Sequence, residues 1–206
     1  MQWNFNLGRF VRLLAHWALD ETEGDIAYDS FALNDAAVRG NAIWQPEGGH
    51  INGALQLDGV DDYVQTDFII DPSKGPLSVH AWIKGDTPGQ AIVSQEMAIP
   101  TFNSVWLGTD PIDGRLVTSH MYPMVSQLES NVVITDNKWH HVGLVWDGTH
   151  RHLYVDDEEV AADEEPFKHL ASSGGLHIGA DSHLQPAAFW SGMIDDVRIY
   201  DWVVAP

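Results

Sequence analysis

The sequence contains no cysteine among its 206 residues. This absence excludes disulfide bonds, thiolate metal sites and a cysteine nucleophile. Basic residues are also scarce: 10 Lys and Arg stand against 30 Asp and Glu, which gives a formal net charge of −20. A surface this acidic repels phosphate backbones and anionic lipid, so we expect no nucleic-acid partner and no binding to a membrane surface.

Long hydrophobic runs are absent as well. The longest apolar stretches are far shorter than the roughly 20 residues of a membrane-spanning helix, so we expect no membrane insertion. Residues 1–11 contain Arg9 but lack the apolar stretch of a signal peptide. We therefore expect a chain that either is not exported or has been cut out of a longer precursor.

Alternation of apolar and polar residues is the main pattern that is present. It runs through Leu77–Lys84, His140–Trp146 and Arg151–Val155, and a period of two is typical of β-strands. Glycine and proline turns separate these segments, no helical stripe lasts three turns, and Glu158–Leu170 is predicted to be a short strand followed by a loop. The pattern predicts an all-β sandwich or barrel.

One turn predicts a specific hairpin. Asp147-Gly148 stands between two alternating segments, so Val142–Trp146 is expected to pair with His152–Asp156. No internal repeat or low-complexity linker divides the chain, and 206 residues is a common length for one all-β domain. We therefore expect a single domain over residues 1–206.

A series of short phrases occurs in a fixed order along the chain, and these phrases resemble the laminin-G-like, concanavalin A-like jelly-roll family over residues 13–201. The resemblance implies an antiparallel two-sheet β-sandwich, a LamG-like jelly roll. The phrases are His16-Trp17-Ala18-Leu19-Asp20-Glu21, Tyr28-Asp29-Ser30, Ala54–Val64, Leu77–Lys84, Trp139-His140-His141-Val142, Arg151–Asp156 and Gly192–Tyr200.

The resemblance also implies that the first and last strands pair antiparallel. A strand over Leu13–Asp20 would then end where the strand from Met193 begins, which brings Asp20 and Asp195 together at one corner. Simple alternation along the last strand places Asp195 on an apolar, inward face. A buried carboxylate needs a partner, either a cation, an arginine or the backbone amides of a turn.

Members of the resembled family often hold one structural calcium ion at such a corner. Hard oxygen ligands in an irregular loop suit calcium rather than zinc. This chain departs from the family's glycine-containing loop, because residues 29–35 read Asp-Ser-Phe-Ala-Leu-Asn-Asp. The predicted calcium ligands are Asp20, Asp29, Asn34 and Asp195.

The histidines and tryptophans are the other conspicuous residues. His140, His141, His150 and His152 surround one hairpin, but neighbours in a strand point to opposite faces, so we interpret them as structural. Aromatic rings with Asn, Gln and His side chains suit sugar recognition on the concave sheet of a jelly roll or at its rim. The candidate glycan-binding residues, which lie outside the family's core phrases, are Gln95, Asn103, Trp106, His120, Tyr122 and Trp190.

The function that this pattern favours is a non-catalytic carbohydrate-binding or adhesion-type module of an extracellular bacterial protein, part of a larger multidomain chain. Its partner would be a polysaccharide or glycoconjugate. One alternative is a polysaccharide hydrolase or lyase on the same fold, although no Glu-x-Asp-x-x-Glu cluster is present; a lyase would draw on Arg115, His120 and Tyr122. A second alternative is a protein–protein scaffold.

Overall fold

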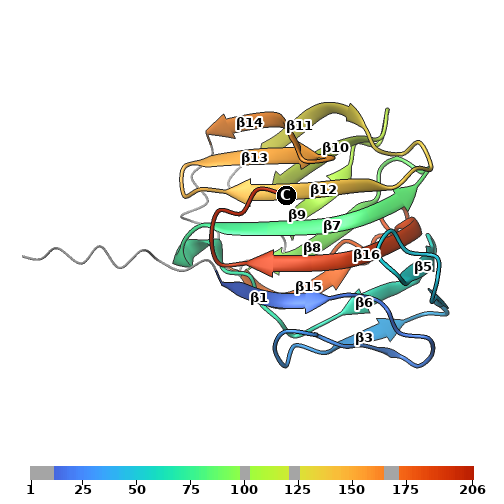
Figure 1. Ribbon diagram of the computed structural model, residues 1–206. Coiled ribbons are helices and arrows are strands. Elements are labelled where there is room, and N and C mark those ends of the chain that lie inside the picture. The colour runs from blue at the N-terminus through green and yellow to red at the C-terminus, as the bar shows by residue number, and fades with distance from the viewer. Residues whose placement is uncertain (1–11, 98–102, 121–125, 165–171) are drawn as a thin grey trace, which may run out of the picture.

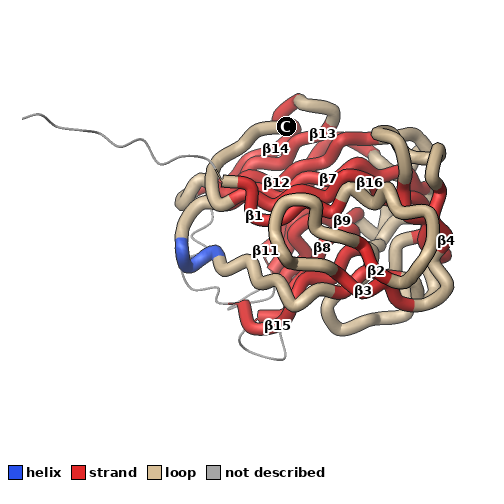
Figure 2. Tube along the Cα trace, turned by 60° about the horizontal axis from the view of Figure 1, so that its bottom comes forward, coloured by secondary structure: helices blue, strands red, loops and turns tan. Residues whose placement is uncertain are grey.

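The structure is a computed structural model that describes residues 12–97, 103–120, 126–164 and 172–206. Two antiparallel sheets lie face to face as layers of a sandwich (Figures 1 and 2). The one helical element of the described residues is a single 3-10 turn, η1 (Pro72–Lys74), at one end of the sandwich. The predicted fold class, an antiparallel β-sandwich, is therefore confirmed.

The first sheet, sheet A, has eight strands. In order they are β14 (Glu158–Glu164), β13 (His150–Val155), β12 (His140–Trp146), β7 (Leu77–Gly85), β16 (Ser191–Tyr200), β5 (Ala54–Asp58) and β4 (Ile43–Gln45), with β1 (Leu13–Trp17) beside β16. β7 pairs with one edge of β16. The other edge is shared, with β5 on Ser191–Ile194 and β1 on Val197–Tyr200.

The second sheet, sheet B, also has eight strands and lies behind sheet A in Figure 1. Its order is β11 (Ser126–Val133), β10 (Arg115–His120), β9 (Asn103–Thr109), β8 (Ala91–Met97), β15 (Ser172–Ile178), β6 (Tyr63–Gln65), β3 (Ala36–Arg39) and β2 (Ile26–Ala27).

The core fills the space between the two sheets. Alternate residues of each strand face it, for example Val79, Ala81 and Ile83 of β7. Burying this apolar surface is the main term that stabilises the sandwich. Four tryptophans are among its largest fully buried side chains, namely Trp17, Trp106, Trp146 and Trp190.

The predicted hairpin is borne out, and so is the strand part of the predicted strand-plus-loop. Val142 pairs with Val155 and Trp146 with Arg151 across the Asp147-Gly148 turn. The strand part of 158–170 is β14, and residues 165–170 lie outside the described residues. No helix of the described residues is long and apolar enough to cross a membrane.

The first and last strands pair antiparallel as expected, but the last strand contains a bulge. Register shifts between Asp195 and Arg198, and Asp196 adopts a φ of 51°. Ile194 and Val197 both face the core as a result, so Asp195 points to the outer side of sheet A. The expectation that Asp195 faces inward was wrong, because simple alternation ignores the extra residue of a bulge.

The chain after β16 turns back across the outer side of sheet A, where the C-terminus lies near β12 (Figure 1). The Ser78 hydroxyl donates to the Trp202 carbonyl at 2.7 Å and accepts from the Val204 N–H at 2.9 Å. Val204 in turn accepts a hydrogen bond from His80 Nε2 at 2.9 Å. This C-terminal segment covers His80, which is only 3% exposed.

Candidate functional site

A buried aspartate marks the corner where β16 leaves β5. Asp195 is 0% exposed, and its Oδ2 accepts a hydrogen bond from the Ile51 N–H at 2.8 Å. Its Oδ1 is buried and has no hydrogen-bond partner among the described residues. Burial raises the pKa of Asp195 to about 7, and the charges of Asp196 and Asp20 contribute in the same direction. The carboxylate therefore lacks a compensating positive charge.

Asp20 and the loop of residues 49–53 complete this Asp195 corner. Asp20 Oδ1 accepts from the Gly53 N–H at 2.8 Å, so one loop contacts both aspartates. Glu21 follows, and its buried Oε2 has no partner within the described part of the chain. The loop is tight: a Cβ on Gly49 would lie 1.8 Å from the Gly53 carbonyl oxygen and 2.9 Å from Asp195 Oδ2.

The other two predicted calcium ligands form a separate turn. Asp29 Oδ1 accepts from the amides of His16 and Phe31 at 2.9 and 3.0 Å, and Oδ2 accepts from the Asn34 side chain at 2.8 Å. These hydrogen bonds outweigh partial burial and lower the pKa of Asp29. In the described structure, the carboxylates of Asp20, Asp29 and Asp195 do not come within 4.8 Å of one another as one group. Asp29 and Asn34 thus act as a turn-forming pair.

Three aspartates on the turn after β5 do have carboxylates that lie close together. Asp58, Asp61 and Asp62 have carboxylate oxygens within 4.8 Å of one another. Backbone amides already occupy the carboxylates of two of them, since Asp58 accepts from the Val60 N–H at 2.8 Å and Asp62 from the Asn41 N–H at 2.6 Å. The group shapes a turn.

The histidines beside the β12–β13 hairpin are divided between the two sides of the strand, as predicted. His140 Nδ1 and Nε2 bond separately to Asp156 at 2.9 Å and Asp136 at 3.0 Å. His141 instead stacks on Trp82 with a centroid distance of 4.7 Å. These two histidines do not converge on one ligand position.

Two of the predicted glycan-binding rings are buried. Trp106 is 1% exposed and Trp190 is 0% exposed, so neither offers a face on which a sugar could stack. Trp106 and its neighbour Leu107 both reach the core because register shifts interrupt β9 on either side. Trp190 packs over Gly85, where a Cβ would lie 2.7 Å from its ring. The expectation that these rings are exposed was therefore wrong.

Of the other predicted ligand-binding residues, Gln95 and His120 are also buried. Gln95 is 0% exposed; its amide accepts from Ile70 at 3.2 Å and donates to the Gly174 carbonyl at 2.7 Å. His120 is 3% exposed. Asn103 pairs with Glu96 within sheet B, and Tyr122 lies outside the described residues. Gln95 is thus a structural residue that links β8 to β15 and to the loop at Ile70.

A pocket of about 220 Å³ with both apolar and polar walls lies on the outer side of sheet B. Leu116 faces the core, so Val117 and Ser119 of β10 face outward. Val105 of β9 and Gln127 of β11 are the register partners of Ser119 and share its face. Walls come from three loops, represented by Gln90, Pro111, Asp181 and Ala188. We call this the sheet B pocket.

Several polar groups of the sheet B pocket are available to a ligand. Gln90 Oε1 accepts from the Ser191 N–H at 2.8 Å, which fixes its amide orientation and leaves Nε2 as a donor. The side chains of Ser119 and Gln127 make no hydrogen bond to any described residue. Sequence reasoning missed this site, because its residues come from separate loops and strands that only the sheet register brings together.

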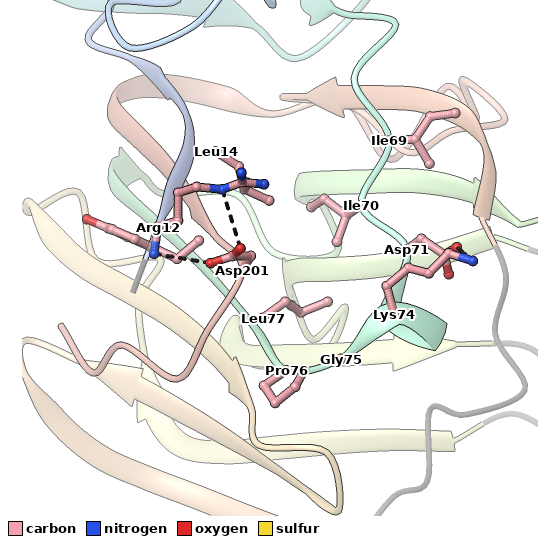
Figure 3. Close-up of a pocket in the computed structure, with 11 residues that line it drawn as sticks. Arg12, Leu14, Ile69, Ile70, Asp71, Lys74, Gly75, Pro76, Leu77 and Asp201 are labelled. Atoms are coloured by element: carbon pink, nitrogen blue, oxygen red, sulfur yellow. Dashed lines mark hydrogen bonds and ion pairs between the residues drawn. The ribbon is translucent and has the colours of Figure 1, made fainter. Parts of the chain in front are cut away.

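A second pocket of about 260 Å³ lies beside η1 (Figure 3). Its walls include Leu77 and Ile70. Its two cations are already paired, Arg12 with Asp201 at 3.4 Å and Lys74 with Asp71 at 3.6 Å. It therefore presents little uncompensated charge to a ligand.

Comparison with known proteins identifies the family to which this fold belongs. The family model described as "Concanavalin A-like lectin/glucanases superfamily" matches residues 58–206. Domain 4 of AbnA, a GH43 extracellular arabinanase from Geobacillus stearothermophilus, was solved in complex with arabinotriose; it superposes with a TM-score of 0.72 at 17% identity, covering 95% of each chain. A search of curated proteins found no significant match.

Two longer proteins contain the same fold. The binding domain of Paraclostridial Mosquitocidal Protein 1 has a TM-score of 0.70 at 11% identity, covering 93% of this chain and 49% of that chain. Trypanosoma rangeli sialidase, solved with the inhibitor DANA, has a TM-score of 0.65 at 16% identity, covering 93% of this chain and 31% of that chain. At these identities the structures establish the fold alone. The family model matches more than half of the residues of this chain, and the chain therefore belongs to the concanavalin A-like lectin/glucanase superfamily.

Proposed function

We propose that this chain is a non-catalytic carbohydrate-binding module that holds a glycan in the sheet B pocket. The observation behind this proposal is a small open pocket on a rigid sheet whose free polar groups are mostly neutral amides and hydroxyls. Ser119 and Gln127 stand on neighbouring strands in fixed register, so their spacing is set before a ligand arrives. Such preorganisation lowers the entropic cost of binding.

The pocket lacks the acid pair of a glycosidase. Hydrolysis of a glycosidic bond generally uses two carboxyl groups about 5–9.5 Å apart. Among the described residues that line the sheet B pocket, Asp181 is the one carboxylate, and its Oδ1 already accepts the Gln185 N–H at 2.7 Å. This supports binding rather than catalysis at the pocket.

The charge of the chain favours a neutral glycan. A net charge of −20 repels uronates and sulfated sugars over a distance of about a Debye length. The structural neighbour that was solved with arabinotriose binds a neutral pentose oligomer. We therefore propose neutral plant-type polysaccharides, arabinan among them, as the first ligands to test.

We propose calcium as the ion of the Asp195 corner. The residues fit this ion: two buried carboxylate oxygens, Asp195 Oδ1 and Glu21 Oε2, have no partner among the described residues, and the donors are all oxygen. Asp195 and Asp20, which the 49–53 loop joins, would hold it; the carboxylates of Asp20, Glu21 and Asp195 are not within 4.8 Å of one another as a group and would have to close around the ion. The ion would supply the positive charge that buried Asp195 lacks, and would fasten the 49–53 loop to β1 and β16.

The wider setting follows from the same proposal. A module that binds a glycan without cleaving it usually serves a larger protein. It holds that protein close to a polysaccharide substrate or on a cell surface. We propose that this chain belongs to an extracellular multidomain bacterial protein.

The test is retention on a panel of insoluble polysaccharides with simultaneous assay of reducing and unsaturated ends. We compare the wild type with Gln127→Ala and with Ser119→Trp, which fills the pocket. Lys74→Ala, beside η1, is the matched control at the other pocket. We expect at least a tenfold loss of retention for Ser119→Trp and none for Lys74→Ala.

Three results would contradict the proposal. Equal retention by Ser119→Trp would move the glycan site elsewhere on the domain. Release of reducing or unsaturated ends by the wild type would instead make the protein a hydrolase or lyase. Absence of retention on every polysaccharide would favour the protein–protein scaffold.

A further inference from the structure

A serine, a histidine and an aspartate form a chain of hydrogen bonds on the outer side of sheet A. His16 lies between Ala15 and Trp17, which face the core, so its side chain points outward. His16 Nδ1 lies 2.8 Å from the Ser30 hydroxyl oxygen, and His16 Nε2 lies 2.6 Å from Asp196 Oδ1. A nucleophile, a base and a third group that orients the base are the parts of an activated hydroxyl.

Asp196 determines which nitrogen of His16 carries the proton. A carboxylate can only accept, so Nε2 donates to Asp196 and Nδ1 carries a lone pair. Asp196 is 4% exposed, and the Arg198 guanidinium donates to the same carboxylate oxygen at 3.0 Å. The imidazole is therefore oriented with its basic nitrogen toward Ser30.

The bulge in β16 makes this arrangement possible. It places Asp196 on the same side of sheet A as His16, and it gives Asp196 a φ of 51°, which is uncommon for a residue other than glycine. Backbone strain of this kind persists where the surrounding structure holds the residue, and it is concentrated at functional sites.

Ser30 presents its hydroxyl both to solvent and to His16. The residue is exposed, so a small reagent can reach the oxygen. The hydroxyl proton has two acceptors, Nδ1 at 2.8 Å and the His16 carbonyl at 3.0 Å. That carbonyl already accepts the Ser30 N–H at 2.8 Å, whereas Nδ1 has no other hydrogen-bond partner among the described residues. The imidazole is therefore placed to remove the hydroxyl proton as the oxygen attacks.

We propose that Ser30 is an activated nucleophile that takes an acyl group from activated esters, with His16 as its general base and Asp196 as the residue that positions the base. The Ser30 oxygen forms a bond to the acyl carbon, and the bond from that carbon to the phenol oxygen of the ester breaks. The leaving oxygen keeps the electron pair of that bond, and the hydroxyl proton passes to His16 Nδ1. This acylation site lies on the opposite sheet from the sheet B pocket and goes beyond glycan binding.

The acyl group should remain on Ser30. The amide N–H groups of Ser30 and its neighbour are already bonded, Ser30 to the His16 carbonyl at 2.8 Å and Phe31 to Asp29 Oδ1 at 3.0 Å. Neither is available to stabilise the oxyanion through which an acyl-serine is hydrolysed. A phenolate leaves readily enough for the first step without such donors, but water must attack an ordinary ester in the second. We therefore expect stoichiometric modification rather than turnover.

The test is incubation of the full chain with p-nitrophenyl acetate, followed by absorbance of the released p-nitrophenol and by peptide mass spectrometry to locate the acetyl group. The expected result is one acetyl group per chain, on Ser30. Ser30→Ala should remove it, and His16→Gln should slow its formation at least tenfold. Ser73→Ala is the matched control and should react as the wild type does, because the Ser73 hydroxyl donates to Asp71 at 2.5 Å and has no imidazole beside it.

Asp196→Asn tests the positioning role. Asparagine can donate to Nε2, which moves the imidazole proton to Nδ1 and removes the base. Acetylation should slow at least tenfold, and the nitrogen NMR shifts of the His16 ring should report the other tautomer. A merely structural effect of the substitution would leave that tautomer unchanged.

Two outcomes would overturn the proposal. One is a wild type in which Ser30 carries no acetyl group after prolonged incubation with the ester. The other is undiminished acetylation of Ser30 in His16→Gln. Circular dichroism confirms that each variant is folded; Ser30 is exposed and the His16 side chain is 20% exposed, so substitutions at these two positions leave the core intact.

Discussion

Acid should destabilise this protein through one histidine that the C-terminal segment covers. His80 is 3% exposed and donates from Nε2 to the Val204 carbonyl. Burial lowers the pKa of His80 to about 4, and the charge of His141 lowers it further, with a smaller contribution from Arg198; the Val204 carbonyl and Asp157 oppose them. The phenol ring of Tyr200 also packs against His80, with 5.6 Å between the two ring centroids.

The sign and size of the effect follow from proton linkage. Between pH 6.5 and 4 the unfolded chain holds a proton on His80 that the folded protein does not, so stability falls as the pH falls through this window. With pKa values of 6.5 unfolded and about 4 folded, the loss is about 2 kcal/mol at pH 5 and about 3 kcal/mol at pH 4.

The assay is urea unfolding followed by tryptophan fluorescence at pH 7.5 and pH 5, for the wild type and His80→Gln. Glutamine retains an N–H donor for the Val204 carbonyl but cannot titrate. Carboxylates contribute nearly equally in both proteins, so the difference between the two pH dependences isolates His80. The wild type should lose about 2 kcal/mol more than the variant.

Parallel pH dependences of the two proteins would refute the reasoning. They would mean that the C-terminal segment releases His80 to water before it titrates. His183→Gln is the control for removal of a histidine as such, and it should follow the wild type.

Two further predictions concern the corner and the core. Chelation should lower the melting temperature of the wild type, and Asp195→Ala should abolish that response; an unchanged wild-type melting curve in excess chelator would exclude the calcium ion. Trp106→Ala should cost about 3–5 kcal/mol of folding stability, because the ring is buried in the core. Urea unfolding measures this loss, and a loss below about 1 kcal/mol would contradict the burial.

Local patterns were sufficient for the architecture. Alternation along Leu77–Lys84 and His140–Trp146 located two neighbouring strands of sheet A, and the Asp147-Gly148 turn located the hairpin. The ordered phrases supplied the pairing of β1 with β16, which brings Asp20 to the corner that holds Asp195. These features depend on strand period and turn chemistry, which a single sequence expresses directly.

The candidate sites depend on features that a single sequence does not express. The bulge at Asp195 and Asp196 moves one carboxylate to the opposite side of the sheet. Register shifts on β9 bury Trp106 beside Leu107, which simple alternation forbids. The sheet B pocket joins Gln90, Ser119 and Asp181, which are distant along the chain. Each of these features is set by pairing between strands.

The position of β16 in sheet A has a consequence for synthesis on the ribosome. This strand covers residues 191–200, yet it lies between β7 and β5, which are made more than a hundred residues earlier. Until residue 200 has emerged, sheet A is split into three parts, namely β14–β13–β12–β7, β5–β4 and β1, each with an open, hydrogen-bonding edge. Folding of the sandwich therefore waits for the last strand, and during that interval the nascent chain exposes aggregation-prone edges that a chaperone would need to shield.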